Sequence, residues 1–191
     1  MLCYSLTQML FLIYMVHGLT IQDLKTQLIQ VQKNLSNQQD KIMLLAENIA
    51  SSISNKMPFI YTYSEFEGVA LRLKQQLNEN SKRHACYNLI PEMNHNEIVP
   101  WIKQNLCVIP IFLNGFASFR NKKRMEITLH EINKSVDDIL EFTTGEESYF
   151  EQYFYFIHLI DFVSVSLAEI EGVDPYNIDL IDSLKKQLKS I

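Results

Sequence analysis

Short apolar runs alternate with stretches of helical periodicity along this chain, and this alternation restricts the fold more than any other feature of the sequence. Four runs rich in β-branched and aromatic residues are candidate strands, at 58–63, 84–90, 106–113 and 138–143. Between the first two, Val69, Leu73 and Leu77 recur at the spacing of one helix face. Strands that alternate with such helices form a parallel sheet with helices on both faces. The sequence therefore predicts an α/β fold, a three-layer doubly wound parallel sheet.

Three further helices complete this pattern. Apolar spacing predicts one helix over 122–134 and an amphipathic helix at the end of the chain, with Ile181, Leu184 and Leu188 on one face. The segment 150–170 is apolar almost all round, which is typical of a helix that is central and buried.

Residues 1–54 are expected to form extra N-terminal helices, and 55–191 the α/β domain. The apolar run 9–16 predicts a buried helix, because no Lys or Arg precedes it and polar residues surround it. A secretory or membrane segment is the alternative for this run. After residue 20 we expect two polar helices, separated by a break at 34–37, with a coiled coil as the alternative.

Charge, cysteines and missing motifs exclude several function classes. The chain has 17 Lys and Arg against 22 Asp and Glu, so binding of nucleic acid through its phosphates is not expected. The cysteines Cys3, Cys86 and Cys107 are scattered, which indicates reduced thiols in a cytoplasmic protein that is not bound to a membrane. The signatures of dinucleotide, nucleoside triphosphate, zincin and α/β-hydrolase sites do not occur in the sequence.

Glu79 and His95 are the residues whose chemistry stands out. The glutamate ends a predicted helix, and the histidine lies sixteen positions later in the loop after the next strand. A carboxylate and an imidazole that converge at a sheet edge would serve proton transfer next to a carbonyl. Spacing alone equally fits a solvated glutamate and a surface histidine.

Several separated motifs, in a fixed order, add a resemblance that covers nearly the whole chain. They are L-N-E-N-S-K at 77–82, P-E-M-N-H-N-E-I-V at 91–99, L-C-Y-S-L at 2–6, L-I-D-F-V-S at 159–164, G-V-D-P at 172–175 and I-D-S-L-K at 181–185. The sequence resembles the C-terminal half of bifunctional phosphoglucose/phosphomannose isomerases, which consist of two sugar isomerase (SIS) domains. The resemblance implies a flavodoxin-like SIS domain over 55–191, joined to its N-terminal half by the preceding helices.

The resemblance also implies roles for individual residues. Glu79 matches the catalytic base, which moves a proton between C2 and C1 of the sugar through a cis-enediolate. His95 matches the histidine that opens the pyranose ring and that reaches the active site of the neighbouring subunit. Lys185 matches a lysine that assists ring opening, with Lys186 as the alternative. The asparagines beside these motif positions are expected to bind substrate: Asn78, Asn80 and Asn94. No metal or organic cofactor is implied.

The implied substrate is a phosphosugar, with glucose 6-phosphate or mannose 6-phosphate converted to fructose 6-phosphate. The family binds the phosphate through a Ser/Thr-rich loop of the first SIS domain, for which 191 residues leave no room. We therefore expect a homodimer, or a complex with a separate N-terminal SIS half. The alternative is a non-catalytic SIS module that binds a sugar phosphate or mediates dimerisation.

Overall fold

The computed structural model describes residues 20–103, 107–146 and 148–189. The chain forms two compact units, Met1–Gln39 and Asp40–Ile191. The helix predicted from the apolar run 9–16, the motif at 2–6 and Cys3 lie outside the described residues.

The first described element is α2 (Ile21–Ile53), a single helix of 33 residues. It begins with a reciprocal cap, in which Thr20 N donates to Asp23 Oδ2 (3.0 Å) and Asp23 N donates to Thr20 Oγ1 (3.1 Å). The predicted break at 34–37 is wrong. Three of those four residues are polar, but none is Gly or Pro, and Asn34 Oδ1 accepts a hydrogen bond from Gln30 Nε2 one turn earlier (2.9 Å).

The four predicted strands are confirmed and form one parallel sheet in the order β2-β1-β3-β4. Their bounds are β1 (Met57–Tyr63), β2 (Cys86–Ile90), β3 (Val108–Asn114) and β4 (Leu140–Thr143). β1 is central, and its Tyr61 is paired with Asn88 of β2 on one side and with Phe112 of β3 on the other.

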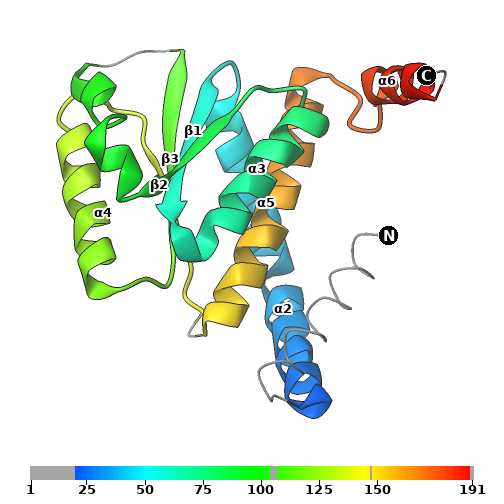
Figure 1. Ribbon diagram of the computed structural model, residues 1–191. Coiled ribbons are helices and arrows are strands. Elements are labelled where there is room, and N and C mark those ends of the chain that lie inside the picture. The colour runs from blue at the N-terminus through cyan, green and yellow to red at the C-terminus, as the bar shows by residue number, and fades with distance from the viewer. Residues whose placement is uncertain (1–19, 104–106, 147, 190–191) are drawn as a thin grey trace. The chain divides into compact units, whose positions relative to one another are not determined.

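Helices cover both faces of this sheet, as Figure 1 shows. α3 (Glu67–Glu79) and α5 (Tyr149–Glu171) pack side by side on one face, and α4 (Phe119–Ile132) lies on the other. Val69, Leu73 and Leu77 of α3 are fully buried, as their spacing predicts. The structure therefore confirms the α/β fold with three layers.

Two of the predicted helices are less buried than their composition suggests. α5 buries one face, including Leu159, Ile160 and Val163, whereas Val165 on another face is 38% exposed. The expectation of a fully buried helix is thus correct for one face only. By length and composition α5 would also pass for a membrane span, but its buried face belongs to the core of this domain. The last helix, α6 (Asp179–Leu188), has no buried residue, and its Leu184 is 59% exposed.

A substitution at Gly115, which follows β3, tests how tightly the side chains pack at the carboxyl edge of the sheet. A Cβ atom at this position would lie 2.6 Å from the Phe66 ring and 3.1 Å from Phe156. We expect Gly115→Ala to lower the free energy of unfolding by about 1–3 kcal/mol, because both rings are buried and cannot move aside freely. Chemical denaturation of the full chain measures this loss.

Gly145→Ala is the matched control, because nothing lies within 4 Å of a Cβ atom at Gly145. Equal stability of the two variants would contradict the packing described for Gly115.

Candidate active site

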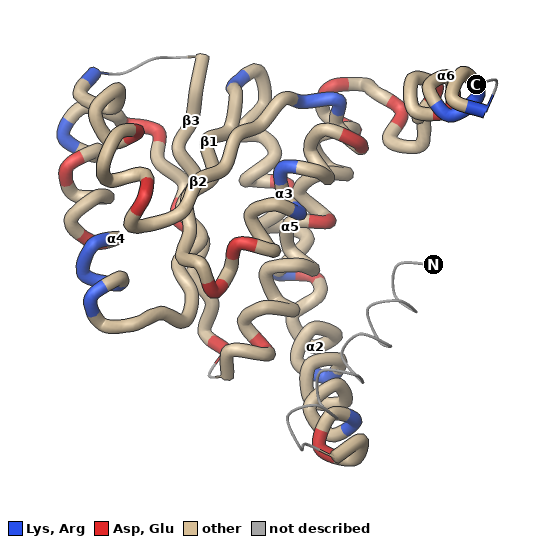
Figure 2. Tube along the Cα trace, viewed as in Figure 1, with Lys and Arg blue, Asp and Glu red and all other residues tan. Residues whose placement is uncertain are grey.

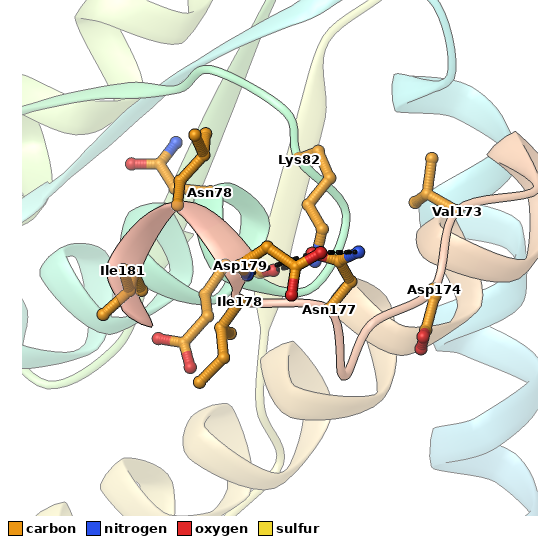
Figure 3. A pocket seen from close by; sticks show the side chains of 10 residues that line it. Asn78, Lys82, Val173, Asp174, Asn177, Ile178, Asp179 and Ile181 are labelled. Carbon is orange, nitrogen blue, oxygen red and sulfur yellow. Dashed lines mark hydrogen bonds between the residues drawn. The ribbon is translucent and has the colours of Figure 1, made fainter. Parts of the chain in front are cut away.

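Glu79 is the last residue of α3 and lines a pocket of about 580 Å³ (Figure 3). Lys82 enters the same pocket from the turn that follows α3. The remaining walls come from the end of α3 and from the segment between α5 and α6, at Asn78, Val173, Asp174, Asn177, Ile178, Asp179, Leu180 and Ile181. Glu79 therefore shares this pocket with Val173 and Asp174 of the G-V-D-P motif.

The chain reaches this pocket because Gly172 ends α5 in the left-handed region, with φ of 66°. The following turn is fixed by Asp174, whose Oδ1 accepts a hydrogen bond from Tyr176 N (2.9 Å). Asn177 Nδ2 then donates to Asp179 Oδ2 (3.2 Å). Figure 3 draws the hydrogen bonds among the residues of this pocket as dashed lines. On the α6 side the pocket is thus lined by both polar and apolar side chains, with Asp174, Asn177 and Asp179 as the polar ones.

Buried and partly buried hydrogen bonds hold the end of α3 against α5. Asn80 Nδ2 donates to Ser164 Oγ (2.9 Å) and to Gln76 Oε1 (2.7 Å). Ser81 Oγ donates to the backbone carbonyl of Ser164 (2.6 Å), and both serines are almost completely buried. Because these bonds flank Glu79 directly, they fix the backbone from which its carboxylate extends.

His95 ends a short 3-10 helix, η2 (Glu92–His95), in the loop that follows β2, and its side chain is exposed. The loop is anchored on both sides of the histidine. Asn94 Nδ2 donates to Thr128 Oγ1 of α4 (2.7 Å), and Trp101 Nε1 donates to the hydroxyl of Tyr61 (3.1 Å). Burial raises the pKa of Tyr61, so this hydroxyl stays protonated at neutral pH.

Within one chain, Glu79 and His95 lie at opposite edges of the sheet and do not converge. α3 returns the chain from the carboxyl end of β1 to the amino end of β2, whereas η2 follows the carboxyl end of β2. The five residues of β2 alone span about 16 Å at the usual rise of a parallel strand. A site that uses both residues would need them from two different chains.

The other predicted site residues are divided between the pocket and the surrounding structure. Asn78 lines the pocket and donates through Nδ2 to the carbonyl of Arg83 (2.7 Å). The amide groups of Asn80 and Asn94 hold α3 and the His95 loop, as described above. Lys185 and Lys186 are exposed on α6 and are not among the residues that line the pocket. Lys185 Nζ lies 3.7 Å from Asp182 of the same helix.

Two features of the pocket were not found from the sequence. Lys82 belongs to the L-N-E-N-S-K run, but no spacing rule distinguishes it from a solvated lysine. Asn177 and Asp179 follow Pro175, and only the folded turn brings them to the end of α3. In the part of the chain that the structure describes, no group of three or more His, Cys, Asp or Glu could hold a metal ion.

Comparison with protein families decides what this domain is. Residues 43–188 match the family described as the bacterial phospho-glucose isomerase C-terminal SIS domain. The chain belongs to this family. The chain is 33% identical over 169 residues to the bifunctional phosphoglucose/phosphomannose isomerase of Aquifex aeolicus, covering 86% of this chain and 52% of that protein. It is 34% identical over 153 residues to the enzyme of the same name from Thermoplasma acidophilum, covering 78% of this chain and 48% of that protein.

The SIS domain thus spans about half the length of the curated relatives that it matches. Among solved structures it is similar to the C-terminal domain of glucosamine-fructose-6-phosphate aminotransferase from Francisella tularensis, with a TM-score of 0.62 and 17% identity. That match covers 83% of this chain and 48% of the other. At this identity the likeness shows the fold alone.

Ser164→Ala tests the attachment of α3 to α5. The substitution leaves the partly buried amide of Asn80 without its Ser164 partner, so we expect the free energy of unfolding to fall by about 1 kcal/mol. Backbone amides around Glu79 should also exchange faster with solvent, which hydrogen exchange detects. Ser52→Ala is the control, since its exposed hydroxyl bonds only the Asn48 carbonyl within α2. Unchanged exchange near Glu79 would contradict the attachment.

Proposed function

We propose that this domain supplies the catalytic base of a phosphosugar isomerase that converts glucose 6-phosphate and mannose 6-phosphate to fructose 6-phosphate. The proposal rests on the pocket at the end of α3. Glu79 and residues of the G-V-D-P turn both line this pocket, and both belong to motifs that resemble the isomerase family. Membership of the family and the names of the curated relatives support the same reaction. Such an enzyme would work in the cytoplasm, as the cysteine usage also predicts.

The reaction needs a carboxylate near C2 of the open-chain sugar. Glu79 removes the C2 proton, and the electron pair forms the C1–C2 double bond while negative charge develops on O1. The protonated Glu79 then returns the proton to C1, and the hydroxyl proton of O2 passes to O1. An aldose thereby becomes a ketose, with no net change in atoms or electrons.

We propose that the complete site is composite, with Glu79 from one chain and His95 from a second copy. The separation of the two residues across β2 supports this arrangement, because an isologous dimer lets opposite edges of two sheets meet. Exposed apolar residues on α6, among them Leu180 and Leu188, also favour a further contact surface. His95 would open the pyranose ring before the proton transfer at C2.

The phosphate of the substrate requires a second SIS half. The domain spans about half of its curated relatives, and the loop that holds phosphate in the family belongs to the other half. Remote phosphate binding normally positions the reacting carbons against the base. We therefore expect little or no turnover by the 191-residue chain alone.

Glu79→Gln tests the proposed base in a reconstituted enzyme that contains this chain and an N-terminal SIS half. The amide keeps the shape of the side chain but cannot accept the C2 proton, so kcat should fall by about 10²- to 10⁴-fold. Interconversion of fructose 6-phosphate and glucose 6-phosphate measures the loss. Glu169→Gln on the exposed surface of α5 is the control and should retain full activity. Comparable activity of both variants would mean that Glu79 is not the base.

Mixing two impaired variants of the same reconstituted enzyme tests the composite site. Dimers of Glu79→Gln alone and of His95→Ala alone should each be impaired at both sites. In a mixed dimer, one site combines the two substituted residues and the other combines the two native ones. Random exchange of subunits should therefore restore about a quarter of wild-type activity, since half the dimers are mixed. Activity no higher than the average of the parent variants would place both residues in one chain's site.

A further inference from the structure

Lys82 adopts a backbone conformation that lysine rarely takes. Its φ is 56°, in the left-handed region. Among the described residues other than glycine, only Asn55 shares a positive φ, and asparagine tolerates this region far better. A left-handed residue just after a helix is usually glycine, because glycine has no Cβ to clash with the backbone. A lysine at this position indicates that its side chain serves something other than local stability.

The side chain of Lys82 lies in the Glu79 pocket (Figure 3). Its Nζ donates to the backbone carbonyl of Glu79 (2.6 Å), which leaves two of the three ammonium donors for a ligand. Lys82 is the only basic residue among the ten that line the pocket, whose lining also includes three carboxylates, those of Glu79, Asp174 and Asp179. Without this lysine, the pocket would present only negative charge to an anionic substrate.

We propose that Lys82 binds the negatively charged O1–O2 end of the sugar in the Glu79 pocket and stabilises the enediolate. This inference rests on the proposed function. The ammonium donates hydrogen bonds to the oxyanion and keeps its own protons, while Glu79 carries the proton between C2 and C1. The exposed Lys185 is not among the pocket residues, so Lys82 is the cation that the described structure places next to the base.

Binding of an enediolate mimic tests this role directly. The probe is 5-phosphoarabinonate, whose carboxylate has the charge and shape of the enediolate end. With the reconstituted enzyme that contains this chain and an N-terminal SIS half, calorimetry should show binding, and NMR should show shifts at Glu79 and along the 173–181 segment. Lys82→Met keeps the length of the side chain but removes the charge, so its Kd should rise at least tenfold. Glu79→Gln should bind as tightly as the wild type or more tightly, because it removes a negative charge.

Lys122→Met is the matched control. Figure 2 shows the basic residues gathered at the start of α4, which follows the carboxyl end of β3 and so lies across the sheet from Glu79. This variant should bind the probe as the wild type does. Absence of binding by the wild type, or equal binding by Lys82→Met, would overturn the proposal.

A stability comparison tests the strain argument. Lys82→Gly removes both the charge and the Cβ clash, so its Tm should rise by about 2–4 °C, whereas Lys82→Met should leave the Tm unchanged. A Tm of Lys82→Gly at or below that of the wild type would contradict the claim that lysine is retained at a structural cost.

The reconstituted enzyme separates this inference from the proposed function. If Lys82→Met changes neither kcat nor KM of the reconstituted enzyme, the proposed role of Lys82 is refuted, but the proposed isomerase function is not. Probe binding that depends on Lys82, without any turnover by a reconstituted enzyme, would refute the isomerase and support the anion site.

Discussion

Parallel pairing of β1 with both β2 and β3 is the constraint on which the rest of this domain depends. Because neighbouring strands run in the same direction, the chain has to cross back over the sheet between them, and α3 makes the first of these crossings. The crossing leaves Glu79 at the amino edge of the sheet, and β2 then carries the chain to His95 at the carboxyl edge. The separation of the two residues is therefore a consequence of topology. No change in loop conformation would bring them together within one chain.

The position of Glu79 depends further on how the end of α3 meets α5. The hydrogen bond of Ser81 to Ser164 is buried and that of Asn80 to Ser164 is partly buried, and each contributes about 1 kcal/mol. The bidentate pair between Arg72 and Asp161 joins the same helices, but both side chains are partly exposed, and such a pair contributes less than about 1 kcal/mol. The serine contacts thus hold the end of α3, with Glu79, more firmly than the ion pair does.

The exposure of the Glu79 pocket bears on whether this domain associates with a second chain. The pocket has three carboxylates and one cation, Lys82, in its lining, and the side chains of Glu79 and Lys82 are exposed. The proton abstraction that we propose would need a further surface to exclude water. α6 carries apolar side chains such as Leu184 without a buried residue of its own, and α5 is buried on one face only. These surfaces fit a domain that completes its active site through association.

The sequence alone determined the layers, the strand positions and the buried face of α3, because alternating strand and helix periodicities admit few other solutions. It also drew attention to Glu79 and His95, through the motifs around them. It failed at 34–37, where polar composition suggested a break that the backbone does not make, and at α5, where composition overstated burial. Only the tertiary structure decided that Glu79 and His95 lie at opposite edges of the sheet and that Lys82 shares the pocket with Glu79. Those relations follow from the crossover path and from one left-handed backbone angle, and neither leaves a periodic signal in the sequence.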